Sequence, residues 1–220
     1  MISIDTVYQK VLALANKEQR GYITPQEFNL FADQAQKEIF YDLNQLVRTN
    51  SNSEEYSDIV HNLNEKIAVF ESTSTINSGT IAKTDVYRLG TVIYNNTEVE
   101  EVQQNEILYI NKTPLTAPTL DRPVYVRTSD STVDIYPVVK SANCTYVRVP
   151  SKPSWGYFVV GNKALYDSSN TKTTNFELHP SEESELVYRI LAYAGVAIEK
   201  PQLTQVAAGL QTVQVQQEKQ

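Results

Sequence analysis

Residues 24–47, TPQEFNLFADQAQKEIFYDLNQLV, carry the strongest folding signal in the chain. Thr24 is placed to act as an N-cap, Pro25 takes the first helical position, where a missing N–H costs nothing, and Glu27 completes a capping box. Behind this start, apolar side chains recur at spacings of three and four residues: Phe28, Phe31, Ala35, Ile39, Leu43 and Leu46. The pattern predicts one long amphipathic helix that ends near Val47.

Further helices are expected on both sides of this one. Ser3 is placed to cap a first helix, Gly21 falls in the break after it, and a third helix is expected over about residues 53–70. The inward-facing residues of the first and third helices again have helical spacing: Ile4, Val7, Val11 and Leu14, then Ile59, Leu63, Ile67 and Phe70. Residues 1–72 are therefore expected to form the N-terminal part of a helical bundle.

The hydrophobic period changes after residues 71–80, ESTSTINSGT, which are expected to form a flexible polar break. Residues 157–160 and 164–166 on either side of Gly161 predict a hairpin. Other short β-rich runs, separated by Pro, Asn, Ser and Asp, begin at Val86 and continue at residues 92–94, 107–110, 124–126, 133–136 and 146–149. Because no helical pattern separates these runs, residues 80–178 are predicted to form an antiparallel β domain.

Helical periodicity returns near the C-terminus. Ser181 is expected to cap a helix with Glu182, Glu183 and Glu185 in its first turn, the sign that suits the helix dipole. Residues 180–220 are expected to return to the bundle. The predicted fold class is therefore α+β: a helical bundle formed by N-terminal and returning C-terminal helices, with an inserted antiparallel β domain.

Composition and charge exclude several classes of protein. The chain has 220 residues, 41% of them hydrophobic, and a formal net charge of −7. No basic stripe is visible, so sequence-specific nucleic-acid binding is not expected. Cys144 is the only cysteine, which excludes an intramolecular disulfide scaffold. The first residues lack the pattern of a signal peptide, and no run approaches the ~20 apolar residues of a membrane span.

Candidate catalytic groups are few. His61 falls on the polar side of the third predicted helix, and His179 precedes Pro180 at a corner, where a turn residue is the default. Cys144 lies in a strand run with no nucleophile motif around it. The motifs of hydrolases, phosphate-binding loops, dinucleotide-binding turns and zinc proteases are all missing.

The positions of the carboxylates in the sequence are also explained without a catalytic or metal-binding role. Asp130 and Asp134 suit a turn and an exposed strand position better than an acid/base pair, and Glu98, Glu100 and Glu101 suit a charged edge strand. The sequence therefore predicts no enzyme, no catalytic residue, no metal ligand and no cofactor. Fourteen tyrosines against one tryptophan are consistent with protein interfaces and equally with cross-strand packing.

Three stretches resemble a known family: Ala15–Asn29 (ANKEQRGYITPQEFN), Pro123–Pro137 followed by Tyr146–Trp155, and Glu182–Glu199. The first is similar to a recurrent opening of virion structural proteins in short-tailed and crAss-like bacteriophages. The order of helices, small sheet and returning helices resembles the head-to-tail adaptor proteins of the tail-tubular-protein-A type.

This resemblance implies a ring of twelve copies that docks beneath the phage portal protein, carries other tail or ring proteins and lets the genome DNA pass. The protein would be assembled in the host cytoplasm and reside at the head–tail junction of the virion. In such rings the C-terminal segment attaches to the portal, here about residues 202–220. Its sparse apolar stripe supplies the expected partner contacts, which are Leu203, Val206, Leu210 and Val213.

Other interpretations stay open. The C-terminal stripe would equally suit a helix packed on its own bundle. Another stacked ring or a fibre-attachment protein of the virion would have the same composition. A surface- or glycan-binding module, suggested by the tyrosine-rich sheet, is a different class.

Overall fold

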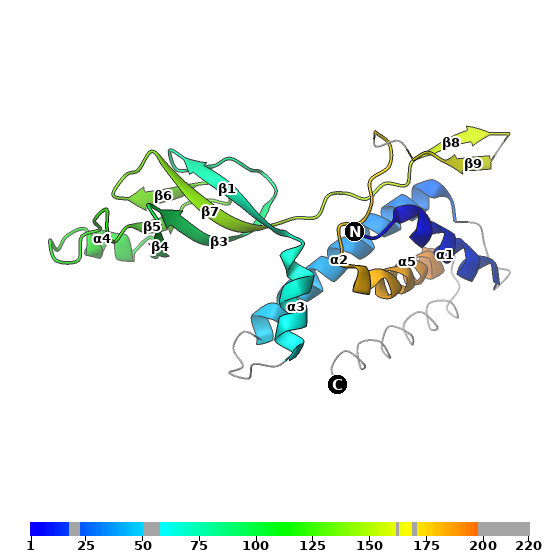
Figure 1. Cartoon of the computed structure of the whole chain (residues 1–220), viewed down its shortest axis with the longest axis horizontal. Helices are drawn as coiled ribbons and strands as arrows, with labels where there is room; N and C mark the ends of the chain where they lie inside the picture. The colour runs from blue at the N-terminus through cyan, green and yellow to red at the C-terminus, as the bar shows by residue number, and fades with distance from the viewer. Residues whose placement is uncertain (18–22, 51–57, 162, 169–170, 198–220) are drawn as a thin grey trace. The chain divides into compact units, whose positions relative to one another are not determined.

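The structure is a computed structural model that describes residues 1–17, 23–50, 58–161, 163–168 and 171–197. The chain forms two compact units, whose elements are labelled in Figure 1. The helical unit comprises Met1–Val69 and Pro150–Gln220, and the sheet unit comprises Phe70–Val149.

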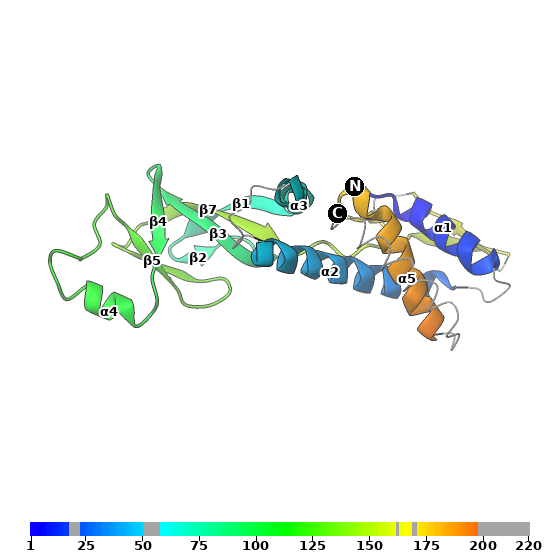
Figure 2. The same ribbon diagram turned by 90° about the horizontal axis from the view of Figure 1, so that it is seen from below.

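The helical unit is built around its longest helix, α2 (Pro25–Asn50). This helix contacts α3 (Asp58–Ala68) and α5 (Glu183–Ala197), and α1 (Ile4–Lys17) contacts α5. Figure 1 and Figure 2 both show α5 alongside α2. The apolar stripes meet in a core that includes Ile4, Val7, Phe28, Ile39, Phe40, Phe176, Leu186 and Ile190.

The predicted start of α2 is confirmed. The Glu27 backbone N–H donates to Thr24 Oγ1 at 3.3 Å, and the Thr24 N–H donates to Glu27 Oε2 at 2.9 Å. These reciprocal bonds satisfy backbone donors that a helix otherwise leaves without partners. The hydrogen bond from the Thr24 backbone also lowers the pKa of the Glu27 carboxyl.

The sheet unit contains seven strands in the order β2-β1-β7-β3-β4-β5-β6. Their bounds are β1 Glu71–Asn77, β2 Thr80–Ile81, β3 Val86–Tyr94, β4 Thr97–Glu101, β5 Val124–Arg127, β6 Val133–Tyr136 and β7 Ser141–Arg148. Neighbouring strands are antiparallel except β4 and β5, which pair in parallel. The core of this sheet includes Ile76, Ile81, Val92, Val99, Tyr125, Val133, Ile135 and Cys144.

The two ends of this sheet approach each other. The Val133 N–H donates to the Gly79 carbonyl at 2.7 Å, and the Ile81 N–H donates to the Ser131 carbonyl at 2.9 Å. Gly79 has a φ of +82°, and a Cβ there would lie 3.0 Å from the Val133 carbonyl oxygen. Glycine at the β1–β2 turn thus lets the sheet curve into a nearly closed barrel.

The predicted fold class, a helical bundle with an inserted antiparallel β domain, is wrong. The chain is a mixed α/β protein with a seven-stranded, nearly closed barrel-like sheet and, in the described residues, only five α-helices. Residues 107–110, predicted as a β-rich run, belong to the short helix α4 (Glu106–Ile110). This helix lies in the connection from β4 to β5, and such a crossover is what allows two strands to pair in parallel.

The predicted polar break at residues 71–80 is also wrong. Glu71–Asn77 forms β1 and pairs along its whole length with β7. Most β1 side chains are polar, so hydrophobic periodicity gives little signal, whereas the backbone hydrogen bonds that hold the strand depend on no side chain. The predicted hairpin, by contrast, is confirmed: β8 (Tyr157–Val160) pairs with β9 (Lys163–Tyr166) in a separate two-stranded sheet.

Candidate interaction surface

The residues predicted as partner contacts, Leu203, Val206, Leu210 and Val213, lie outside the described residues. Candidate surfaces in the described part of the chain must therefore come from other side chains. An active site would be the alternative to an interaction surface, and it would have to involve the histidines, the cysteine or the carboxylates, whose surroundings are described next.

The histidines are on the helical unit. His61 is exposed on α3, with its Nε2 atom 3.4 Å from Glu65 Oε1 one turn later. His179 is the N-cap of a short 3₁₀ helix, η1 (Pro180–Glu182), and its Nδ1 accepts a hydrogen bond from the Ser181 N–H at 3.3 Å. Ser181, predicted to cap the last helix, lies inside η1 instead, and the cap of η1 is His179.

Cys144 and the aspartates have structural surroundings. Cys144 is 1% exposed in the core of the sheet unit, and burial raises the pKa of its thiol. Asp134 accepts a hydrogen bond from Thr128 Oγ1 at 2.8 Å, and Asp130 lies 3.9 Å from Arg127. Within the described residues, no three His, Cys, Asp or Glu side chains are grouped to hold a metal ion. No helix in the same residues combines the length and apolar composition needed to cross a membrane.

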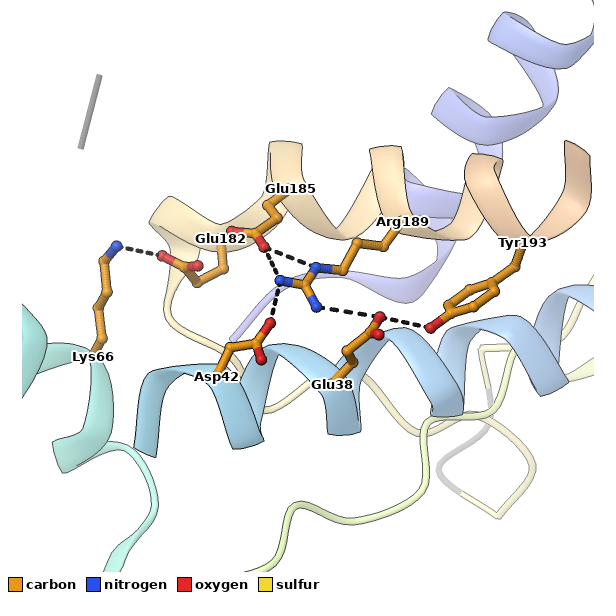
Figure 3. Close-up of polar contacts among 7 residues, drawn as sticks. All are labelled: Glu38, Asp42, Lys66, Glu182, Glu185, Arg189 and Tyr193. Carbon is orange, nitrogen blue, oxygen red and sulfur yellow. Dashed lines mark hydrogen bonds and ion pairs between the residues drawn. The ribbon is translucent and has the colours of Figure 1, made fainter. Parts of the chain in front are cut away.

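A polar cluster joins α2 and α5 inside the helical unit (Figure 3). Arg189, only 8% exposed, donates to Asp42 at 2.6 Å, pairs with Glu38 at 3.2 Å and donates through Nε to Glu185 at 2.8 Å. The Tyr193 hydroxyl donates to Glu38 at 2.6 Å. At the other end, Lys66 of α3 pairs at 2.7 Å with Glu182, which is 1% exposed.

The electrostatics of this cluster favour a fixed arrangement. Burial by itself would lower the pKa of Arg189, but the neighbouring Glu185 and Asp42 carboxylates outweigh it and raise that pKa. Burial and the hydrogen bond to Glu38 raise the pKa of Tyr193 to about 12. Since each charge has a partner of opposite sign, the cluster holds helices together. The only sequence signal for it is the four-residue spacing of Glu185 and Arg189 in the helix predicted after Ser181.

The β8–β9 hairpin is fixed to the helical unit by Trp155. This side chain is 3% exposed and stacks on Tyr157 and Tyr166, with ring centroids 5.8 Å away in each case. Its other neighbour, Tyr8 of α1, has its centroid at 4.2 Å. Trp155 Nε1 also donates to Asp5 Oδ1 at 2.9 Å. Through Tyr157 and Tyr166 this face of the hairpin packs on the helices, whereas Val159 on the same face is 63% exposed.

The opposite face of the hairpin is apolar and exposed. Phe158 lies across from Leu165, and Val160 lies across from Lys163. Because side chains alternate along a strand, these four residues share the face that is turned away from Tyr157 and Tyr166. Phe158 is 45% exposed, Val160 56% and Leu165 45%. The sequence predicted the hairpin, but hydrophobicity alone did not show that this face would stay uncovered.

β8 pairs only with β9 in the described residues, so each strand also has a free edge. Grouped apolar side chains of this kind are typical of protein-binding surfaces, whereas isolated ones need no explanation. We call Phe158, Val160, Lys163 and Leu165 the hairpin face.

The sheet unit contains a cavity of about 520 Å³ where β4 leaves β3 and joins β5. It is lined by Gly90, Thr91, Val92, Glu98, Val99, Glu100, Glu101 and Tyr125. The Tyr125 hydroxyl donates to Glu101 at 3.1 Å, and burial together with this carboxylate raises the pKa of Tyr125 to about 12.

Comparison of the sequence with models of known protein families and with curated proteins gives no match.

Proposed function

We propose that this protein is a virion structural protein that forms an oligomeric ring, a head-to-tail adaptor between the portal and tail components of a tailed bacteriophage. The observation that carries the proposal is the hairpin face, an apolar surface presented on an anchored hairpin. Phe158, Val160 and Leu165 are exposed there. Burial of their apolar surface against a partner would favour association.

The anchoring of the hairpin supports a binding role. Trp155 holds its inner face through two stacked tyrosines and a hydrogen bond to Asp5. A surface that is already ordered loses less conformational entropy when it binds than a flexible loop does. The hairpin is therefore a preordered surface for binding.

The ring and its place in the virion follow from the sequence resemblance and are part of the proposal. A ring needs contacts between two different surfaces of neighbouring copies, repeated until they close. With a net charge of −7, the wall of a DNA conduit would not hold the negatively charged phosphates of DNA. In this proposal residues 202–220 bind the portal, and normal portal attachment after their deletion would remove that part.

A glycan-binding module has less support. Sugar sites often use aromatic rings that are open to the ligand, but Trp155 is 3% exposed and Tyr125 is 4% exposed. The Tyr125 hydroxyl is already bonded to Glu101. Exposed rings are present at Tyr41, Tyr87 and Tyr109, but none of them lines the cavity beside Tyr125.

The proposal is tested by measuring the mass of the recombinant chain over a range of concentrations and by imaging the assembly by electron microscopy. A closed ring is expected, and Phe158→Ser with Leu165→Ser should weaken it. The matched control is Val138→Ser, which alters a side chain 89% exposed in the sheet unit. A chain that stays monomeric at every concentration would exclude the ring.

A further inference from the structure

We propose that free copies of this protein form a two-fold dimer through the outer edge of strand β8, with Phe158 of one copy opposite Phe158 of the other. The two β8 strands run antiparallel, and the two hairpins together make one four-stranded sheet. The proposal goes beyond the ring, because it concerns copies that are not yet assembled.

The outer edge of β8 is defined by the hydrogen bonds on its inner side. At the base of the hairpin, the Gly156 carbonyl accepts a hydrogen bond from the Asp167 N–H at 2.9 Å. The backbone groups of successive residues point to opposite sides of a strand, so Phe158 also directs its groups toward β9. Tyr157 and Val159 therefore direct their N–H and C=O groups away from β9, and within the described residues these groups have no hydrogen bond.

β8 has none of the features that usually keep an edge strand from pairing. Its sequence, YFVV, contains no charged residue, no proline and no glycine. Folded proteins commonly protect a free edge with lysine, proline or a bulge. The other strand of the hairpin, β9, carries such a lysine, Lys163. Figure 1 shows β8 on the side of the hairpin away from α1 and α2, so a further strand can approach its outer edge.

Exposed apolar side chains lie on both faces of β8. Phe158 is 45% exposed and Val160 is 56% exposed on the hairpin face, and Val159 is 63% exposed on the other face. A partner that packed on one face alone would leave the other face in water. A strand added at the edge places side chains beside both faces at once. The exposure pattern therefore favours pairing at the edge.

A second copy of β8 is complementary to this edge. In an antiparallel pair centred on Phe158, Tyr157 of each copy lies opposite Val159 of the other. These are the two residues whose backbone groups point outward, so the two pairs exchange about four N–H···O=C bonds in all. The two Phe158 rings meet at the two-fold axis, and each Val159 packs beside a tyrosine of the other copy. No charge on either strand opposes the contact.

The edge is already ordered in a single copy. The Tyr157 ring stacks on Trp155 with centroids 5.8 Å apart, and Trp155 is 3% exposed. This anchoring lowers the conformational entropy that is lost when a second strand is added. Because the paired strands run in opposite directions, the helical units of the two copies lie toward opposite ends of the shared sheet.

Pairing and ring formation exclude each other at the hairpin. A two-fold contact joins identical surfaces and is complete once two copies have met, whereas the contacts of a ring join different surfaces. Phe158 belongs both to the paired edge and to the hairpin face. Two paired copies must therefore separate before the hairpin face meets a ring neighbour, so pairing holds back ring assembly.

Proline variants test the edge. Val159→Pro removes an outward N–H but leaves the hydrogen bonds with β9, since proline is tolerated where an edge strand has its N–H toward solvent. It should weaken pairing by about tenfold or more, because each dimer loses two hydrogen bonds. Ala164→Pro makes the same change on the outer edge of β9 and is the matched control. Sedimentation at concentrations below those at which rings form measures both.

Cysteine cross-linking tests the register in a chain that also carries Cys144→Ser. Phe158→Cys places two thiols opposite each other at a non-hydrogen-bonded pair, with Cα atoms about 4.5 Å apart, which suits a disulfide. With diamide as the oxidant, this variant should form a covalent dimer. Val160→Cys on the same face would lie about 13 Å from its counterpart along the strands and should remain monomeric on a denaturing gel.

The outcomes distinguish this proposal from the ring. Equal pairing of Val159→Pro and Ala164→Pro, or no covalent dimer from Phe158→Cys, would overturn the two-fold pairing and leave the ring proposal standing. A chain that cross-links as expected but never forms a ring would support the pairing and count against the ring. A chain that is monomeric at every concentration would overturn both.

Discussion

The guanidinium of Arg189 in α5 donates to the carboxylate of Asp42 in α2 across 2.6 Å, although 147 positions separate them in the sequence (Figure 3). Arg189 is 8% exposed and Asp42 51%, so the contact runs from the buried helix interface toward solvent. Because Glu185 is also 8% exposed, Arg189 compensates a carboxylate that has little water around it. The pair fixes how α5 lies on α2.

Replacing Arg189 by Met should destabilise the helical unit by about 3 kcal/mol, because the Glu185 charge would remain buried without its partner. Replacing Glu185 by Leu in the same chain should recover most of that loss. Urea unfolding followed by Trp155 fluorescence measures both effects, since Trp155 is the only tryptophan and belongs to the helical unit. Lys10→Ala breaks an exposed ion pair with Glu183 and should cost less than about 1 kcal/mol.

Replacing Thr24 by Ala should destabilise the helical unit by about 1 kcal/mol, because the first turn of α2 loses its cap. Thr24→Ser retains the hydroxyl and serves as the control. An unfolding midpoint unchanged by Thr24→Ala would show that the capping box contributes little.

The capping box also predicts a pH dependence. The folded pKa of Glu27 is below the ordinary 4.5, so its contribution is present above that pH and is lost as the pH falls through the folded pKa. Glu27→Gln should therefore be less stable than the wild type near neutral pH, and the two should converge in acid. A difference that persists at low pH would contradict this assignment.

Alkaline solution should destabilise both units. The pKa values of Tyr125 and Tyr193 are raised from 10.0 to about 12, so the folded chain keeps phenol protons that the unfolded chain releases. The contribution of these two tyrosines to the stability of the folded chain is fully present below pH 10 and is lost as the pH rises through about 12. Tyr125→Phe and Tyr193→Phe should reduce the loss, as measured by unfolding at a series of pH values. Equal slopes for wild type and variants would be the contrary result.

Cys144 should react with a thiol reagent only after the sheet unit opens. Its side chain is 1% exposed, and burial raises the pKa of the thiol, so little reactive thiolate is accessible. Absorbance after addition of a disulfide reagent should rise slowly for the native chain and quickly in urea. Because Cys144 is the only cysteine, the signal comes from this position alone. Rapid reaction of the native chain would exclude the buried environment.

Local sequence was sufficient where neighbouring residues decide the structure. The capping box of α2 involves Thr24 and Glu27, three positions apart, and its helical stripe repeats every three or four residues. The β8–β9 hairpin was equally predictable, because two β-rich runs flank a glycine. The hairpin face, by contrast, was not predicted, because the exposure of Phe158 and Leu165 depends on which distant segments pack on the hairpin.

Tertiary structure decided the rest. Residues 71–77 became a strand because β7 offered a complete ladder of backbone partners, and residues 107–110 became a helix within the β4–β5 crossover. The hydrogen bond from Arg189 to Asp42 depends on how α5 packs on α2. The exposure of Phe158 likewise depends on tertiary packing, and no local sequence pattern indicates either feature. The sequence by itself determined those helices and turns whose hydrogen bonds and apolar contacts join residues only a few positions apart. Which strands pair, which charges meet and which faces remain uncovered depended on distant segments, because backbone ladders and buried ion pairs form only when the folded chain brings both partners together.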